Sequence, residues 1–322
     1  MEAVTINHVM QARRSLAPRL PVTPMWSYPA LNAETGASVQ VKHENVQPVG
    51  AFKVRGGLHL LAGMTDAERA RGVVTYSTGN HAQSLAYASA AFDAPCVLVM
   101  PAGANPAKVR AARALGAEVL LHGADLAGAQ QEAERIAASR ELRLVSPGET
   151  PELIAGVGTA YLEILEAVPD LDAMIVPVGS GTGAAAAVVV ARALAPGCRV
   201  IAVQSSASPA AHDSWRAGRC LRRPDRTSAE GLATGRGFEL PQRLMRSGLA
   251  DFRLVSDEAI GAAQRLLASH AHTLAEGAGA AALAALLAMR AELAGQTVAI
   301  VCSGGNANPA ELAALGAPAT PA

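Results

Sequence analysis

Short runs of Val, Ile and Leu recur along the chain and alternate with longer stretches rich in Ala and Leu. The short runs predict strands at 38–42, 73–76, 95–100, 117–121, 173–178, 199–203 and 297–302. Several of these runs are apolar without interruption, which is typical of parallel strands covered by helices on both faces.

The longer stretches predict helices at 81–92, 107–115, 125–140, 155–167, 183–194, 257–270 and 278–292. Ser256, followed by Asp257 and Glu258, gives one of them an N-cap and an acidic first turn. Strands that alternate with helices place the chain in the α/β class. The stretch 219–246, rich in Arg, Gly and Pro, is predicted to be the least regular and to cross the surface.

The composition indicates a globular protein with a small-molecule partner. The 322 residues are 50% hydrophobic, and 27 basic residues balance 27 acidic ones without long runs of one sign. We therefore expect no nucleic-acid or membrane partner. The N-terminus lacks a secretory pattern, the longest apolar run, 277–289, is too short to span a bilayer, and the four cysteines lie far apart. These features predict a soluble, cytoplasmic protein.

Lysine is scarce in this chain. Of the 27 basic residues, only Lys42, Lys53 and Lys108 are lysines. Lys53 lies between Phe52 and Val54, and apolar surroundings lower the pKa of a lysine by disfavouring its charged form. The neutral amine can attack an aldehyde. From these residues alone, a surface lysine at the start of a helix explains the pattern equally well.

A glycine-rich segment follows the predicted strand that ends at Val178 and begins a predicted helix. We call Gly179, Ser180, Gly181, Thr182 and Gly183 the glycine loop. Small residues there allow backbone N–H groups to converge on a phosphate at the positive end of the helix dipole. The spacing is neither a Walker motif nor G-x-G-x-x-G, which disfavours nucleotide binding, and close packing is the alternative explanation.

Two further segments carry polar groups at strand ends. Ser77, Thr78, Gly79, Asn80 and His81 offer hydroxyls, an amide and N–H groups at a helix N-terminus, which suit a carboxylate or a ring oxygen. Ordinary helix capping and a structural histidine are the alternatives, and His81 has no metal-ligand partner at suitable spacing.

The second of these segments, 302–306, begins with Cys302 and Ser303. Its Ser303 hydroxyl lies at the carboxyl end of the last predicted strand, where α/β proteins bind ligands. A simple turn would use the same residues.

In order, PVGAFKVRG, STGNH, the glycine loop after VPVG, and SGGN resemble the serine/threonine dehydratase and serine racemase family of fold type II pyridoxal-phosphate enzymes. The resemblance covers nearly the whole chain. It implies an α/β fold of two three-layer domains with parallel or mixed sheets and the cofactor in the cleft between them. The large domain would comprise 1–71 and 150–322, and the small domain 72–149.

The resemblance also implies a role for each matched residue. Lys53 would carry pyridoxal 5'-phosphate as a Schiff base, with Phe52 packed against the ring region. Asn80 would bond the phenolic oxygen, the glycine loop would hold the phosphate, and Ser303 would meet the pyridine nitrogen. The substrate carboxylate would be bound by Ser77, Thr78, Gly79 and His81.

The implied activity is removal of water and ammonia from a β-hydroxy α-amino acid such as threonine or serine. The amine of Lys53 would take the α-proton. A neutral hydroxyl such as that of Ser303 stabilises a protonated pyridine less than a carboxylate would, which favours β-elimination over transamination.

Several positions depart from the family's pattern. Ala51 stands where many relatives have Ser. Thr78 stands where racemases place a Ser that acts as second base, so Thr78 is a second candidate catalytic residue. Where some relatives bind a divalent cation with acidic residues, this chain has Gln204, Ser208 and Ala210. We therefore expect no metal site, and a monovalent cation remains open.

Other readings stay open. The substrate could be an aryl β-hydroxy amino acid such as phenylserine, or hydroxyaspartate. The chain could be a serine racemase, a β-replacement enzyme of the cysteine-synthase type, a non-catalytic binding protein with the same fold, or, less well matched, a nicotinamide dehydrogenase. We expect a homodimer. Because the sequence stops soon after Asn308, we expect no regulatory domain and no feedback control by isoleucine.

Overall fold

The structure, a computed structural model, describes residues 4–77, 79–104 and 106–316. These residues pack as two compact units. The first unit holds the residues up to Pro21 together with Lys53–Thr159, and the second holds Val22–Phe52 together with the residues from Ala160 onward. The predicted small domain, 72–149, lies within the first unit, and its bounds stay a prediction. Within the described ranges, no helix is both long and apolar enough to cross a membrane.

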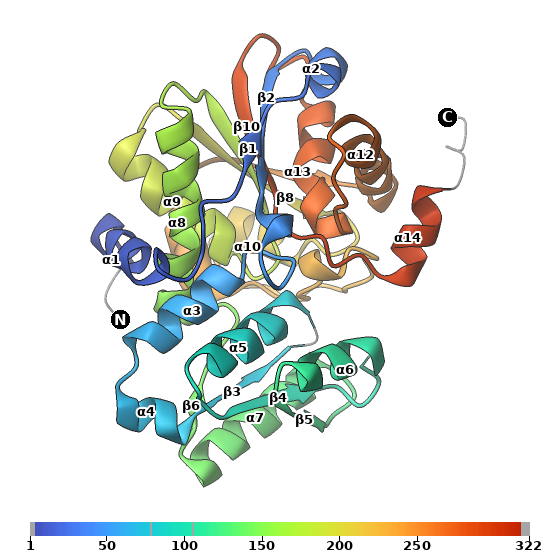
Figure 1. Cartoon of the computed structure of the whole chain (residues 1–322). Coiled ribbons are helices and arrows are strands. Elements are labelled where there is room, and N and C mark those ends of the chain that lie inside the picture. The colour runs from blue at the N-terminus through green and yellow to red at the C-terminus, as the bar shows by residue number, and fades with distance from the viewer. Residues whose placement is uncertain (1–3, 78, 105, 317–322) are drawn as a thin grey trace. The chain divides into compact units, whose positions relative to one another are not determined.

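The second unit is built on a six-stranded sheet with the order β1-β2-β10-β7-β8-β9. Its strands are β1 (Met25–Trp26), β2 (Ser38–His43), β7 (Ala173–Pro177), β8 (Arg199–Ser205), β9 (Leu249–Val255) and β10 (Thr297–Cys302). Neighbouring strands are parallel except β1, which runs antiparallel to β2. In Figure 1 the blue β2 lies beside the orange-red β10, so segments far apart in the sequence are paired within one sheet.

Helices cover this sheet. They are α2 (Pro29–Thr35), α9 (Thr182–Leu194), α10 (Ala210–Ala217), α11 (Glu239–Arg246), α12 (Asp257–His270), α13 (Gly277–Ala288) and α14 (Pro309–Leu315), with short 3-10 turns η1 (Glu44–Val46) and η2 (Glu230–Leu232). The helix α13 contains only Gly, Ala and Leu and is buried over most of its length, packing with α12 and the sheet in one apolar core. A helix that is apolar all round belongs in such a core.

The first unit contains a parallel four-stranded sheet with the order β5-β4-β3-β6. Its strands are β3 (Val73–Tyr76), β4 (Cys96–Met100), β5 (Glu118–Leu121) and β6 (Arg143–Leu144). Its helices are α1 (Ile6–Leu16), α3 (Val54–Gly63), α4 (Asp66–Arg71), α5 (Asn80–Ala91), α6 (Pro106–Ala114) and α7 (Leu126–Arg140), and α8 (Pro151–Ala167) begins here. The helix α7 buries Ala129, Ala133 and Ile136, which recur at helical spacing, against the strands β3 and β4.

The predicted α/β class with parallel strands is confirmed, and each predicted strand and helix is present with its ends shifted by a few residues. The stretch 219–246, predicted to be the least regular, contains η2 and α11. The helix α11 buries Leu240, Leu244 and Met245 on one side. Its Pro241 lies in the first turn, where a missing N–H removes no bond of the helix.

Candidate active site

Lys53 lies at the N-cap of α3 and is held there through its backbone. Its carbonyl accepts the N–H of Gly56 at 3.1 Å and the hydroxyl of Ser84, on α5, at 2.6 Å. A Cβ on Gly57 would lie 2.6 Å from Ser84 Oγ, and one on Gly156 would lie 2.5 Å from the carbonyl oxygen of Arg55. These glycines allow α3 to approach α5 and the start of α8 closely. The backbone that carries Lys53 is therefore fixed by packing on two sides.

The amine of Lys53 is poised to act as a nucleophile. Desolvation by the surrounding protein lowers the pKa of Lys53 from 10.5 to about 8. Roughly a tenth of such amines are neutral at pH 7, compared with less than about one in a thousand for a lysine in water. The predicted effect of apolar surroundings on this lysine is therefore present in the structure.

The segment that follows β3 begins α5. Gly79 is the N-cap of α5, and Asn80 is its first residue. The hydroxyl oxygen of Ser77 accepts the N–H of Gly79 at 3.2 Å. Gly79 has no side chain with which to cap the helix, so the first turn presents backbone N–H groups suited to an anion. Thr78, predicted to be a substrate-binding and catalytic residue, lies outside the described residues.

His81 is buried in the first turn of α5, with 5% of its surface exposed. Its Nε2 lies 3.0 Å from the hydroxyl of Thr75, and that hydroxyl donates to the carbonyl of Val145 at 2.6 Å. The hydroxyl proton is thus used, which makes Nε2 of His81 the donor in its bond. Burial, followed by the charge of Lys53, lowers the pKa of His81 to about 3. His81 is therefore a neutral histidine, and its predicted contact with a substrate carboxylate stays a prediction.

In the second unit the glycine loop connects β7 to α9. Gly181 is the N-cap of α9 and has a left-handed backbone with φ of 93°. A Cβ there would lie 2.8 Å from Cβ of Pro241, and one on Gly179 would lie 2.3 Å from the carbonyl oxygen of Gly231. Neither position has room for a side chain, and the loop leads directly into a helix of 13 residues. This is the backbone geometry that binds phosphate at a helix N-terminus.

The structure brings Ser303, Phe52 and the glycine loop together within the second unit. The N–H of Phe52 donates to the carbonyl of Ser303 at 3.0 Å, and a Cβ on Gly183 would lie 3.5 Å from the Phe52 ring. The Ser303 hydroxyl is buried and donates to the carbonyl of Ala278 at 3.3 Å. This bond is long, so the proton can turn to a better acceptor such as a pyridine nitrogen.

Sequence reasoning missed several residues that shape the site. Ser84 bonds the carbonyl of Lys53, and the Thr234 hydroxyl donates to the carbonyl of Gly179 at 3.4 Å. Ser84 lies one helical turn after Asn80, on α5, which is a signal that could have found it. Thr234 lies in the segment 219–246, where the sequence showed no regular pattern.

Lys42 is one of the three lysines, and the sequence predicted no role for it. Its side chain is buried, and its Nζ donates to Glu163 Oε2 at 2.6 Å and to the carbonyl of Thr23 at 2.9 Å. The hydroxyl of Thr23 in turn donates to buried Glu44 at 2.6 Å. This network anchors the start of the segment 44–52 that leads to Lys53. The amine of Lys42 is engaged in an ion pair with Glu163.

Comparison with known proteins identifies the family. A family model described as pyridoxal-phosphate dependent enzyme matches residues 17–304. The chain belongs to this family. The pyridoxal-phosphate enzyme is 36% identical over 304 residues to the L-threonine ammonia-lyase of Thermotoga maritima, a match that covers 94% of this chain and 76% of that protein.

Two further proteins extend the likeness over almost the whole length. The L-threo-3-hydroxyaspartate ammonia-lyase of Saccharomyces cerevisiae is 32% identical, with 97% of this chain and 96% of that protein covered. The structure of maize serine racemase has a TM-score of 0.91 at 29% identity, with 97% of this chain and 96% of that chain covered. The predicted fold type II and the predicted cofactor, pyridoxal phosphate, are thereby confirmed.

The residues present fit that cofactor. A glycine loop without room for side chains at Gly179 and Gly181 suits its phosphate, a lysine amine with lowered pKa suits its aldehyde, and a hydroxyl just after β10 suits its ring nitrogen. In the described part of the chain, no group of three or more His, Cys, Asp or Glu residues could hold a metal ion.

Proposed function

We propose that this pyridoxal-phosphate enzyme is an ammonia-lyase that converts a β-hydroxy α-amino acid, such as L-threonine or L-serine, to a 2-oxo acid and ammonia. The observation that carries the proposal is the lowered pKa of Lys53, about 8, at a fixed position in a chain of this family. Relatives named as ammonia-lyases, at 36% and 32% identity, support the reaction class.

The proposed reaction balances without an added oxidant or reductant. Lys53 Nζ removes the proton from the α-carbon of the substrate, and the β-hydroxyl leaves as water after protonation. Hydrolysis after release consumes one water, so the net products are the 2-oxo acid and ammonia. When bound, the cofactor ring withdraws electrons from the α-carbon and makes its proton acidic.

In this proposal the matched residues have defined roles toward the cofactor. Lys53 would hold the aldehyde carbon, the glycine loop would hold the phosphate, and Ser303 would donate to the ring nitrogen. Because a serine hydroxyl is neutral, it would favour a protonated ring nitrogen less than a carboxylate would. Loss of a β-substituent needs less charge on the ring than amino-group transfer does, so Ser303 supports elimination.

Two more groups complete the cofactor and substrate contacts in this proposal. Asn80, the first residue of α5, would bond the ring oxygen. The N–H groups at the start of α5, together with Ser77, bind the substrate carboxylate.

A second substrate deserves the same test. The relative named L-threo-3-hydroxyaspartate ammonia-lyase matches over 96% of its own length, whereas the relative named L-threonine ammonia-lyase matches over 76%. Hydroxyaspartate carries the same β-hydroxyl and adds a second carboxylate. The same elimination would then give oxaloacetate and ammonia.

The test is a panel of L- and D-serine, L-threonine, phenylserine and threo- and erythro-3-hydroxyaspartate, assayed for 2-oxo acid, ammonia and the opposite enantiomer. We expect 2-oxo acid and ammonia in equal amounts from at least one L-amino acid. Cofactor binding without ammonia from any member of the panel would refute the lyase proposal. Formation of the enantiomer alone would point to racemisation instead.

We further propose that the enzyme acts as a homodimer in the cytoplasm, in amino-acid catabolism. The reaction consumes an amino acid, and the buried Cys96, Cys198 and Cys302 form no disulfide bond, which suits a reducing compartment. Light scattering coupled to size exclusion should give twice the 32.8 kDa chain mass, and a monomer mass would contradict the dimer. Fractionation of the source cells should place the activity in the soluble fraction.

A further inference from the structure

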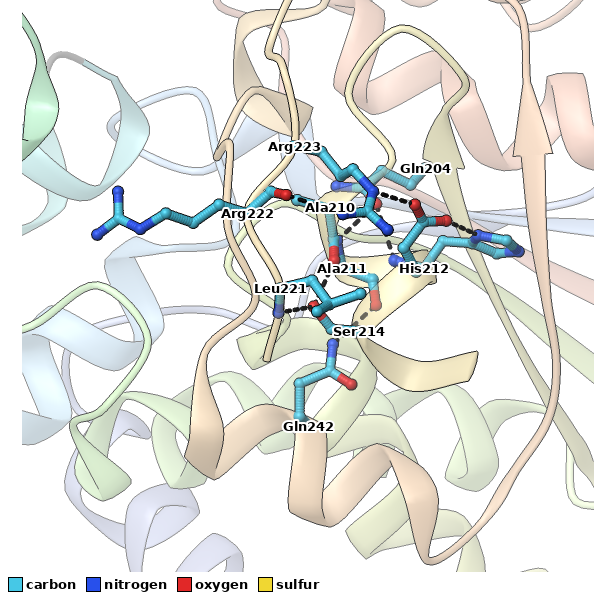
Figure 2. A network of polar contacts seen from close by, with 10 residues as sticks. Gln204, Ala210, Ala211, His212, Ser214, Leu221, Arg222, Arg223 and Gln242 are labelled. Carbon is cyan, nitrogen blue, oxygen red and sulfur yellow. Dashed lines mark hydrogen bonds and ion pairs between the residues drawn. The ribbon is translucent and has the colours of Figure 1, made fainter. Parts of the chain in front are cut away.

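A buried polar cluster in the second unit surrounds the first turn of α10 (Figure 2). Its central residue is Gln204, near the end of β8, whose side chain is fully buried. Oε1 of Gln204 accepts the N–H groups of Ala211 and His212, both at 3.1 Å. Nε2 of the same amide donates to the carbonyl of Leu232 at 3.5 Å. One side chain therefore connects β8, α10 and η2.

A second buried amide reaches the same turn from α11. Nε2 of Gln242 donates to the carbonyl of Ala211 at 2.8 Å, and the side chain is 1% exposed. Figure 2 shows Gln204 and Gln242 approaching Ala211 from two sides. Ser214 adds a third link, because its hydroxyl accepts the N–H of Leu221 at 2.9 Å. The two amides thus fix α11 and η2 relative to α10.

The segments held by these amides are the ones that contact the glycine loop. Gly231, next to Leu232, lies so close to the loop that a Cβ on Gly179 would be 2.3 Å from the carbonyl oxygen of Gly231. Pro241, next to Gln242, lies 2.8 Å from the Cβ position of Gly181. Gln204 therefore bonds Leu232, the neighbour of Gly231, and Gln242 is itself the neighbour of Pro241. Gly231 and Pro241 are the residues that limit the space around the glycine loop.

We propose that Gln204 and Gln242 are positioning residues for the cofactor phosphate. By holding η2 and α11 against the glycine loop, they keep its backbone N–H groups aimed at the phosphate. This inference rests on the proposed phosphate-binding role of the loop. The Gln204 amide suits the task because it donates and accepts at once, and Gln242 donates to the same turn of α10. Removing either amide would leave a buried backbone partner unsatisfied, which is costly.

The test compares four variants of the full-length enzyme: Gln204→Ala, Gln204→Glu, Gln242→Ala, and the control Gln131→Ala on the exposed side of α7. Gln204→Glu keeps the acceptor for the α10 N–H groups but places a carboxylate oxygen against the carbonyl of Leu232, so it breaks the link to η2 alone. The readouts are the Kd for pyridoxal phosphate, by absorbance titration, and the melting temperature with and without the cofactor.

We expect the Kd to rise about tenfold in Gln204→Ala and Gln204→Glu and about threefold in Gln242→Ala, with no change in the control. The increase in melting temperature on adding cofactor should shrink in the same order. If Gln204→Ala does not fold, Gln204→Glu and Gln242→Ala decide the matter. An unchanged Kd with melting temperatures lowered equally in both forms would show a purely structural role and overturn the proposal.

A further variant separates this inference from the proposed function. Gly181→Ala alters the glycine loop itself. If Gly181→Ala weakens cofactor binding but the glutamine variants do not, only the positioning role fails. If Gly181→Ala also leaves the Kd unchanged, the loop does not bind the phosphate. The proposed phosphate-binding role of the loop and the positioning role of the two glutamines then both fail.

Discussion

The glycine loop and the start of α5 each join a parallel strand to a helix, yet they are built on different principles. In the glycine loop, Gly179 and Gly181 are packed so closely that a Cβ would meet backbone or proline atoms within 2.8 Å. At the start of α5, a Cβ on Gly79 would meet nothing within 4 Å, and the neighbouring residues carry polar side chains. The first is specified by backbone shape and the second by side-chain chemistry, which suits a constant phosphate and a selectable substrate respectively.

The largest effect should come from Lys53. Lys53→Ala removes the amine proposed to take the α-proton, so kcat should fall by at least about a thousandfold. The absorbance of the cofactor–lysine bond should vanish with it, whereas Lys108→Ala should retain both properties. Ammonia release and the absorption spectrum provide the measurements. Full activity of Lys53→Ala would remove the basis for the proposed function.

Gly181→Ala should show how strictly shape governs the glycine loop. The substitution strains a left-handed backbone and drives a methyl group toward Pro241, so the Kd for pyridoxal phosphate should rise by about ten- to a hundredfold. Gly197→Ala is the matched control, because its Cβ would meet nothing within 4 Å and its backbone is not left-handed. Gly79→Ala should change the Kd much less than Gly181→Ala, and equal losses would erase the contrast between the two regions.

The pKa of Lys53 predicts how cofactor uptake depends on pH. Its pKa in the folded protein is lowered to about 8, and only the neutral amine attacks an aldehyde. As pH rises toward 8 the neutral fraction grows, so the rate of reconstitution should increase about tenfold per unit below pH 7.5 and level off above pH 8.5. Stopped-flow absorbance after mixing apoenzyme with cofactor measures this rate. A profile that continues to climb to pH 10 would mean that the amine is not desolvated.

Substitution of His81, at the start of α5, should give the smallest effect. Its ring bonds Thr75 and stays neutral, so His81→Ala should lower the melting temperature by a few degrees and kcat by about three- to tenfold. His81→Gln can donate to the same hydroxyl and should recover most of this loss. Because the pKa of His81 is about 3, the pH profile above pH 5 should keep its shape in both variants. A lost titration step near neutral pH would contradict the neutral ring.

Much of this fold could be predicted because its central strands and helices are marked by strong patterns. The central strands β4 and β7 are continuous apolar runs, and α13 is a long run of Gly, Ala and Leu. The elements that escaped prediction lack such marks. β1 and β6 have two residues each, and β9 interrupts its apolar residues with Asp251 and Arg253, as an edge strand exposed to solvent can. In α11, Pro241 made the sequence look like that of a loop, although a proline is tolerated in the first turn of a helix.

The candidate site was predictable to the level of motifs but not of contacts. The motif residues stand at strand ends and helix starts, which local sequence reveals. The direction of a ring or amide depends on distant partners, such as Val145 near His81 and Leu232 near Gln204. No local pattern encodes these pairings, because they are set by how the strands and helices pack.

The scarcity of lysine acquires a practical meaning once Lys42 is seen to be buried in an ion pair with Glu163. An aldehyde mixed with this chain meets few competing lysine amines. Of the three lysines, Lys42 is held in an ion pair and Lys53 is the proposed cofactor lysine. Borohydride reduction after mixing with pyridoxal phosphate should therefore mark one peptide, the one containing Lys53, with little background. Pyridoxal phosphate and borohydride should therefore suit single-site labelling of this protein at Lys53.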